Sequence, residues 1–252
     1  MGMERFMDMH CHLLPEVDDG AQSMEDTRQM LQMARDEGIQ YIVVTPHYHP
    51  HRGKKPPKVL RHQLKLMREE AAKIDENLRV YLGTEIYYGQ DVPELLREEK
   101  VLTMNRTNYV LVEFSHSDPY EYICQGIRQI QMKGYEVILA HIERYHCMCD
   151  NIEDATHIAE MGVKIQVNAD SITGENGRKV KRFVKQMMDR DLVYCVGTDA
   201  HRPGARPPRM KKAAEYVKKK YGEDYMRKIF FSNGRRIMLK RRRRDESGQS
   251  NA

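Results

Sequence analysis

The stretch MDMHCHLLPEVDDG, residues 7–20, ends a short apolar run with two histidines and continues at once into an Asp-Asp-Gly turn. His10 and His12 are separated by one residue, so both imidazole rings point to the same face if this run is a strand. Imidazole and carboxylate groups, without thiolates, suit manganese, iron or zinc in a catalytic site. The stretch therefore predicts a first strand whose end supplies ligands to a metal centre.

Six more short β-rich runs follow, and helical patterns separate most of them. The seven predicted strands are residues 6–10, 41–47, 79–85, 109–114, 136–142, 163–169 and 192–201. Apolar runs of this length are typical of parallel strands that are buried on both faces. The alternation of strands and helices predicts an α/β fold, either a barrel or a doubly wound sheet.

The predicted helices carry start and stop signals. Ser23 stands at the N-cap position of residues 24–37, and Gly38 ends that pattern. The other predicted helices are residues 59–74, 119–134, 151–162, 177–191, 208–221 and 223–239. No linker or repeat interrupts the chain, so we predict one domain over residues 1–239 and a basic, disordered tail over residues 240–252.

The composition is typical of a soluble globular protein, with 252 residues of which 40% are hydrophobic and 31% are charged. No apolar run approaches the roughly 18 residues that span a membrane, and the N-terminus lacks the apolar region of a secretory signal. The five cysteines are odd in number, which predicts reduced thiols and a cytoplasmic protein. Cys147 and Cys149 resemble half of a zinc site, but no second pair matches them.

The formal net charge is +5, and the run KRRRR at residues 240–244 alone accounts for that excess. The rest of the chain is balanced and shows no basic stripe of the kind that nucleic-acid-binding folds carry, so we expect no nucleic-acid partner. The tail is expected to be solvated, and its docking to an acidic partner or a membrane surface is left open.

Histidines and acidic residues stand where six of the seven predicted strands end. In chain order these candidates are His10, His12, Asp18, Asp19, His47, Glu85, Glu113, His141, Glu143, Asp199 and His201, while the sixth strand offers mainly Asn168. In a barrel of parallel strands the carboxyl ends meet on one face, where active sites are built. Each motif alone is weak, since a lone histidine is usually a core or surface residue and DDG is usually a turn. Their joint placement predicts a shared polynuclear metal site.

These motifs, namely His10-x-His12, VDDG, TPH, GTE, EF, HIER and GTDAH, resemble those of the polymerase and histidinol phosphatase (PHP) superfamily. The combination of the DDG turn with HIERY and TDAHRPGARPP is similar to the manganese-dependent protein tyrosine phosphatases of bacterial capsule and exopolysaccharide loci. The resemblance runs from about residue 7 to residue 239, with EVDDG in place of the family's DVDDG. It implies a distorted (β/α)7 TIM-like barrel, the PHP fold, with a metal site at the C-terminal ends of the strands.

The resemblance also implies three divalent metal ions, with Mn²⁺ expected first and Fe or Zn as alternatives. It assigns His10, His12, Glu85 and Asp199 to one ion, Glu85, Glu113 and His141 to a second, and Asp19, His47 and His201 to the third. Arg144 and Arg206 fall where the family has its phosphate-binding arginines, so they are the expected catalytic and substrate-binding residues.

Elementary electrostatics agrees with a phosphate substrate. Three divalent ions bring more positive charge than the four predicted carboxylate ligands neutralise, and the surplus attracts a phosphate dianion. A hydroxide activated by metal is the expected nucleophile near neutral pH, and arginine side chains match phosphate oxygens bidentately. A cysteine nucleophile is excluded, because the residues six positions after the five cysteines are Val17, Ile130, Glu153, Ala155 and His201, and none is arginine.

The expected function is hydrolysis of phosphotyrosine, by resemblance on the tyrosine-rich tail of a bacterial tyrosine kinase that controls capsule or exopolysaccharide synthesis. Two alternatives stay open: a small-molecule phosphomonoesterase such as a histidinol-phosphate phosphatase, and a metal-stabilised regulator that binds a kinase without catalysis. The oligomeric state is left open, and a homo-oligomer is compatible with the sequence.

The remaining histidines are not predicted as ligands. We expect His49 and His51 in a basic loop at the rim of the site, His62 and His157 on helix surfaces, and His116 and His146 in loops. Asp18 is expected to stabilise the turn, and Glu143 either supports a ligand or forms a salt bridge.

Overall fold

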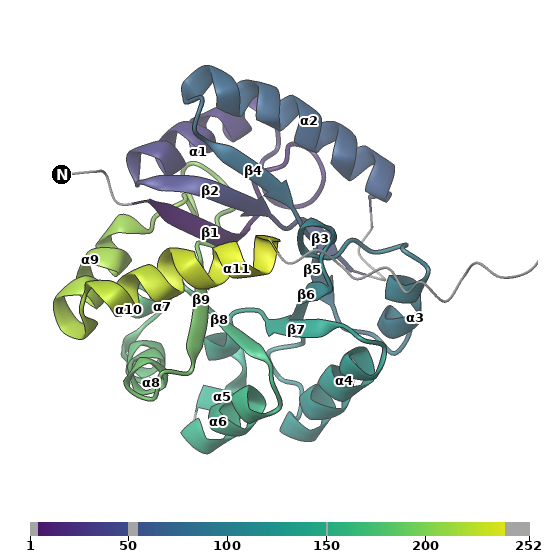
Figure 1. Cartoon of the computed structure of the whole chain (residues 1–252), viewed down its shortest axis with the longest axis vertical. Coiled ribbons are helices and arrows are strands. Elements are labelled where there is room, and N and C mark those ends of the chain that lie inside the picture. Colours follow the sequence, from purple (N-terminus) through teal and green to yellow (C-terminus); the bar gives the residue numbers. More distant parts are fainter. Residues whose placement is uncertain (1–4, 50–54, 150, 240–252) are drawn as a thin grey trace, which may run out of the picture.

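Strands form the centre of the molecule and helices surround them, as the computed structural model of residues 5–49, 55–149 and 151–239 shows (Figure 1). The strands are β1 (Phe6–Cys11), β2 (Ile39–Val44), β3 (His47–Tyr48), β4 (Arg79–Leu82), β5 (Glu85–Tyr87), β6 (Tyr109–Glu113), β7 (Glu136–Leu139), β8 (Lys164–Asn168) and β9 (Val193–Gly197). All the paired strands run parallel. The predicted α/β class with parallel strands is therefore confirmed.

The strands form two ladders, with the order β1-β2-β4 in one and β3-β5-β6-β7-β8-β9 in the other. Two predicted strands are each broken in two, at Thr45–Pro46 and at Gly83–Thr84, and Pro46 has no N–H to offer a ladder. Beyond β9, the His12 N–H donates to the Ala200 carbonyl at 2.8 Å, and the Asp199 N–H donates to the His10 carbonyl at 2.7 Å. The seven predicted runs thus follow one another around a barrel-like arrangement.

The helices mostly lie where the sequence predicts them. They are α1 (Met24–Asp36), α2 (Pro57–Ile74), α3 (Val92–Arg97), η1 (Met104–Arg106), α4 (Tyr120–Met132), η2 (Ile142–Arg144), α5 (His146–Cys149), α6 (Ile152–Glu160), α7 (Ala169–Thr173), α8 (Arg178–Asp189), α9 (Lys211–Tyr221), α10 (Glu223–Arg227), η3 (Lys228–Ser232) and α11 (Asn233–Leu239). The Ser23 side chain accepts from the Asp26 N–H at 3.1 Å, so the predicted N-cap is confirmed.

Two helix predictions at the C-terminal end were inaccurate. The predicted helix 208–221 begins only at Lys211, because the Glu37 carboxylate accepts the N–H groups of Met210 and Lys211 from outside the helix. The predicted helix 223–239 is divided by the wider π-type turn η3 between α10 and α11. The short helices α3, α5 and α7 were not predicted, because each is too short for its sequence to show a helical repeat of apolar residues.

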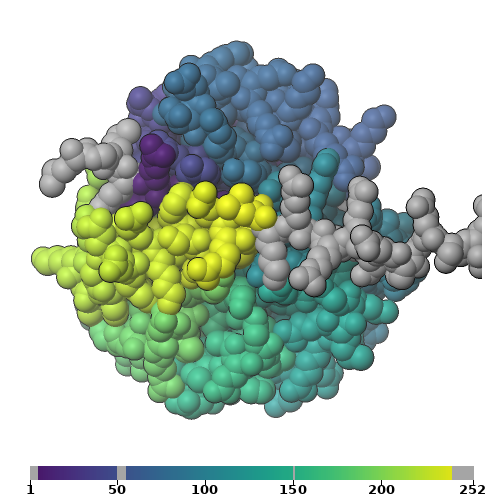
Figure 2. All heavy atoms as spheres, in the orientation of Figure 1, coloured from purple at the N-terminus to yellow at the C-terminus, as the bar shows by residue number. Residues whose placement is uncertain are grey.

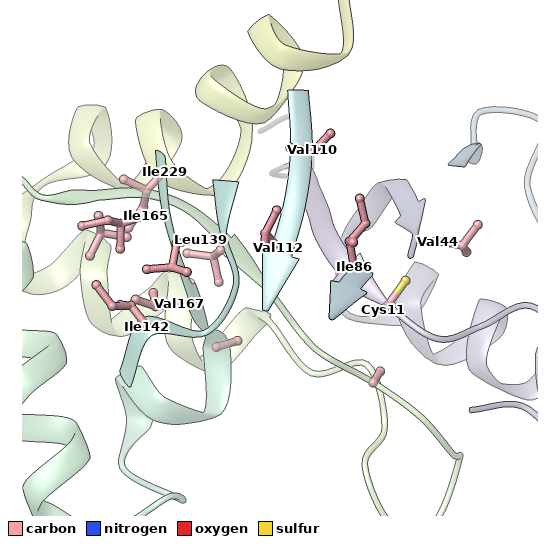
Figure 3. Close-up of a cluster of buried hydrophobic side chains, with 14 of the residues drawn as sticks. Cys11, Val44, Ile86, Val110, Val112, Leu139, Ile142, Ile165, Val167 and Ile229 are labelled. Carbon is pink, nitrogen blue, oxygen red and sulfur yellow. The ribbon is translucent and has the colours of Figure 1, made fainter. Parts of the chain in front are cut away.

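Buried side chains form two layers. The larger cluster lies between strands and helices and includes Val110, Val112, Leu139 and Val167, which Figure 3 shows on neighbouring strands. The smaller cluster contains Met7, Met9, Leu111 and Ile138 together with Ile237 and Met238 of α11. This helix crosses in front of the strands in Figure 1, and its yellow atoms lie on the same face of the molecule in Figure 2. Side chains alternate along a strand, so Leu111 shares its face with Glu113 at the strand end. The smaller cluster therefore continues directly into the predicted site.

Some sequence predictions concern residues that lie outside the described ranges, namely the basic tail at 240–252 and His51. All five cysteines are described, and they are free thiols, as predicted. Within the described ranges no helix is both long and apolar enough to cross a lipid bilayer.

Candidate metal centre

Glu85 stands at the centre of the predicted ligands. It is the first residue of β5 and is 1% exposed. Its Oε2 lies 3.1 Å from His10 Nε2, 3.2 Å from His12 Nε2 and 3.0 Å from His47 Nδ1. Its Oε1 lies 2.8 Å from His141 Nε2. One carboxylate thus faces four imidazole rings, from β1, from the residue directly after β1, from β3 and from the segment that follows β7.

The other carboxylates lie around this centre. Asp199 Oδ1 is 3.7 Å from His10 Nε2 and 3.6 Å from His12 Nε2. Glu113 is 3.5 Å from His47 Nδ1 through Oε1. Three groups of side chains have their ligand atoms close enough to share an ion: His12, Asp19, His47 and His201; His10, His12 and Glu85; and His47, Glu85 and Glu113.

The residues predicted as ligands therefore lie close together, but their grouping differs from the one that the resemblance implied. Neither His141 nor Asp199 belongs to any of the three groups. His12 lies with Asp19 and His201 as well as with His10, and His47 lies with Glu113 as well as with Asp19. His141 is within 3.7 Å of Glu113 Oε2, as expected for its set. No cysteine belongs to any of the three groups, so the Cys147–Cys149 pair gains no support as a zinc site.

The residues present fit divalent cations. Glu85 Oε2 is buried without a hydrogen-bond partner among the described residues, and His10 Nε2 and His12 Nε2 face each other at 3.2 Å. Burial raises the pKa of Glu85, but the His10 charge and the close imidazoles of His10, His12 and His141 hold that pKa well below its usual range. Burial and the neighbouring His12 lower the pKa of His201 to about 3, which leaves a neutral imidazole, the form that binds metal. Such a concentration of buried nitrogen and oxygen atoms calls for compensating cations.

Two of the candidate ligands have left-handed backbones. His141 has φ 31° and Asp199 has φ 53°, a conformation that residues other than glycine rarely adopt. Each residue stands two positions after the last residue of a strand. The unusual conformation turns the chain sharply, so that both side chains face Glu85 or the His10–His12 pair. Strained backbone of this kind clusters at functional sites.

A polar network from β8 supports the centre, and the sequence pattern indicates only part of it. Gln166 Oε1 accepts the His141 N–H at 2.9 Å and lies 3.1 Å from His10 Nδ1. Gln166 donates to Asn168 at 2.9 Å, and Asn168 in turn donates to Asp199 Oδ2 at 3.1 Å. Asn168 was noted as the polar end of its strand, whereas Gln166 was missed; its only signal was a polar side chain inside an apolar run.

Asp18 and Glu143 also have defined places. Asp18 Oδ1 accepts the Gly20 N–H at 2.9 Å, which confirms its role in the turn. Its Oδ2 additionally lies 2.8 Å from His12 Nδ1 and accepts the His47 N–H, so that it fixes the orientation of one predicted ligand. Glu143 is buried and accepts the Asn168 N–H at 2.8 Å. The structure thus favours the supporting role for Glu143 over a salt bridge.

Both predicted arginines contact the same oxygen, Asp199 Oδ2. Arg144 Nη2 lies 2.5 Å from it, and Arg206 Nη2 also contacts it. Burial raises the pKa of Asp199, but His10 and Arg144 outweigh burial and lower that pKa below its usual range. Two guanidinium groups consequently border the metal centre from the side of Asp199.

A cavity of about 1030 Å³ opens over these groups. Its lining includes Glu85, Glu113, His141, Asp199, Arg144 and Arg206, together with Asp19, His47, His49, Tyr87, His116 and His201. The position of His49 at this rim agrees with the prediction. His62 and His157 are exposed on α2 and α6, also as predicted. His116 lies in a loop, as predicted, whereas His146 begins the short helix α5, so its predicted place in a loop was wrong. An open, charged cavity over a metal centre suits a substrate that carries an anionic group.

Comparison with known proteins agrees with this geometry. A sequence model of the family described as "Capsular polysaccharide synthesis, CpsB/CapC" matches residues 6–239. The chain belongs to the CpsB/CapC family. It is 32% identical over 238 residues to the tyrosine-protein phosphatase CpsB of Streptococcus pneumoniae, covering 92% of this chain and 98% of that one. It is 31% identical over 218 residues to the tyrosine-protein phosphatase YwqE of Bacillus subtilis, covering 86% of both chains.

Comparison with solved structures agrees with membership of the CpsB/CapC family. A crystal structure from a study of YwqE and CpsB, described as unique metal-dependent tyrosine phosphatases, has a TM-score of 0.86 and 29% identity and covers 93% of this chain and 95% of its own. The lactonase Lmo2620 of Listeria monocytogenes has a TM-score of 0.61 at 10% identity and covers 95% and 96% of the two chains. The second likeness concerns the fold alone and is consistent with the predicted barrel type.

Proposed function

We propose that this chain is a metal-dependent protein tyrosine phosphatase. The observation that carries the proposal is one buried carboxylate, Glu85, facing four imidazoles while Arg144 and Arg206 border the same cavity. Membership of the CpsB/CapC family and the names of the related phosphatases support the same reaction. No thiol belongs to the centre, so the mechanism needs no cysteine nucleophile.

Three divalent ions, with Mn²⁺ expected first, would be held by the five histidines and four carboxylates of the centre. The proposed ligands are His10, His12, Asp19, His47, Glu85, Glu113, His141, Asp199 and His201. Bound divalent ions supply positive charge for the phosphate and lower the pKa of a water that they bind. Asp18 and Gln166 would keep the rings of His12 and His10 in fixed orientations, which is how supporting groups tune metal ligands.

Arg144 and Arg206 would bind and orient the phosphate group. Their guanidinium groups converge on Asp199 Oδ2 at the wall of the cavity, so each can donate hydrogen bonds to an anion placed there. Donors fixed in advance stabilise negative charge that grows on the phosphate oxygens in the transition state. Both side chains are only part-exposed, which limits the competition from water.

The substrate assignment is tested against the small-molecule alternative by comparing the turnover of a phosphotyrosine peptide and of histidinol phosphate, each with and without added Mn²⁺. We expect metal-dependent hydrolysis with a higher kcat/KM for the peptide. A higher kcat/KM for histidinol phosphate would contradict the protein substrate, and no turnover of either compound by metal-loaded protein would favour the kinase-binding regulator.

The proposal extends to the partner and to the setting of the reaction. A bacterial tyrosine kinase of a capsule or exopolysaccharide locus is the proposed substrate, because the family is named for capsular polysaccharide synthesis. We place the reaction in the cytoplasm, where free thiols persist. We also assign residues 1–239 to one domain, supported by a continuous core that includes Phe6 and Phe230.

A further inference from the structure

We propose that the stacked side chains of His49 and Tyr87 form a wall that receives the aromatic ring of the substrate beside the metal centre. The inference rests on the proposed function and concerns the part of the substrate beyond its phosphate. The two ring centroids are 4.4 Å apart, and the ring planes are inclined by 32°. Both side chains are half-buried and line the cavity that contains Glu85 and Arg144.

His49 and Tyr87 lie side by side in the same way as the predicted ligands His47 and Glu85, two residues farther along each chain segment. His47 pairs with Glu85 in the parallel register of β3 and β5. His49 and Tyr87 each come two residues later, so they point to the same face as His47 and Glu85. Two residues advance a strand by about 6.6 Å. The aromatic pair thus lies next to the ligand pair, toward the carboxyl ends of the strands.

This position matches the shape of an aryl phosphate. In phosphotyrosine a single ester oxygen joins the ring to the phosphorus, so a phosphate held at the centre brings its ring beside the nearest neighbouring wall. Aromatic rings attract one another in offset or tilted arrangements. An alkyl phosphate, such as phosphoserine or histidinol phosphate, has no ring at its ester oxygen. The metal centre contacts the phosphate group, which aryl and alkyl esters share. Contact with the wall therefore makes aryl esters bind more tightly than alkyl esters.

The test separates ring binding from catalysis. Phenylphosphonate and methylphosphonate carry the same anionic group, and only the first has a ring. We would measure the Kd of each by calorimetry with the full chain loaded with Mn²⁺. We expect Tyr87→Leu to weaken phenylphosphonate binding about tenfold and to change methylphosphonate binding by less than about twofold. Tyr87→Phe keeps the ring and should bind both compounds as the parent does.

Two further variants complete the design. Tyr216→Leu changes a half-buried tyrosine of α9 that does not line the cavity, and it should alter neither Kd. His49→Leu, placed after β3, tests the same wall if Tyr87→Leu does not fold. Equal effects on both phosphonates, or no effect on either, would overturn the wall. These results are distinct from a failure of the parent to hydrolyse phosphotyrosine peptide, which would overturn the proposed function instead.

Discussion

Asp199 joins the two halves of the candidate site in one carboxylate. Its Oδ1 faces His10 and His12, while its Oδ2 contacts both arginines and accepts from Asn168. Because Asn168 also holds this side chain, the loss of one arginine should leave Asp199 in place. The arginines can therefore be changed without dismantling the metal centre.

We predict that Arg144→Ala and Arg206→Ala each lower kcat/KM by roughly 30- to 1000-fold, or about 2–4 kcal/mol, because each removes a charge-assisted contact to the phosphate. Metal content and the far-UV circular dichroism spectrum should stay those of the parent. Arg202→Ala is the matched control, since Arg202 lies in the same loop and is exposed without lining the cavity. If both alanine variants stay within about fivefold of the parent, the arginines do not bind the phosphate.

The thiols give a second prediction at this scale. Replacing all five cysteines by alanine should leave turnover per metal-loaded chain unchanged, because none lies within the three ligand groups. Thermal stability should fall, since Cys11 and Cys195 are fully buried and a smaller side chain leaves a cavity. Steady-state kinetics with metal analysis checks both statements. A specific loss of kcat in a folded, metal-loaded variant would show that a cysteine takes part in catalysis.

At the scale of elements, a charged contact joins α1 to α2 on the outside of the strands. Glu70 of α2 accepts from Arg28 Nε of α1 and from Lys73 Nζ, both at 2.7 Å. These hydrogen bonds lower the pKa of Glu70 from 4.5 to about 2. The folded state therefore gains stability from this carboxylate above its unfolded pKa, and loses that gain as the pH falls toward 2.

We predict that Glu70→Gln lowers the Tm at pH 6, and that the difference from the parent shrinks as the pH falls to 3. Thermal melts followed by circular dichroism at several pH values measure this difference. Glu69→Gln is the control on the same helix, because its contact with Lys65 is 4.0 Å long and exposed. A difference that stays constant between pH 6 and pH 3 would show that the charge of Glu70 does not link the two helices.

At the scale of the whole molecule, strands from β1 to β9 deliver their ends to one centre. We predict that the purified protein holds more than one transition-metal ion per chain, and that chelation abolishes activity and lowers the Tm. The ions offset the repulsion among buried carboxylates. Because they bind the folded protein, their removal lowers the free energy of unfolding. Elemental analysis of an active preparation checks the count. At most one ion per active chain would exclude the three-ion centre.

The sequence alone determined the α/β class, most element positions and the set of candidate ligands. These features follow from local rules: apolar runs make strands, polar residues end them, and parallel strands bring their carboxyl ends to one face. His10, His12 and Glu85 could therefore be named before any contact was known. The same local rules could not foresee the division of residues 223–239 by a π-type turn, which breaks the helical period.

Only the tertiary structure decided which side chains touch. It placed Glu85 among four imidazoles, joined Gln166 of β8 to His10 of β1, and stacked Tyr87 on His49. Contacts between strands that are distant in the chain depend on which strands pair and on how they curve around the core, and a local pattern of residues does not specify either. The left-handed backbone of His141 and Asp199 has the same origin, because packing around the centre holds a conformation that the isolated residues disfavour.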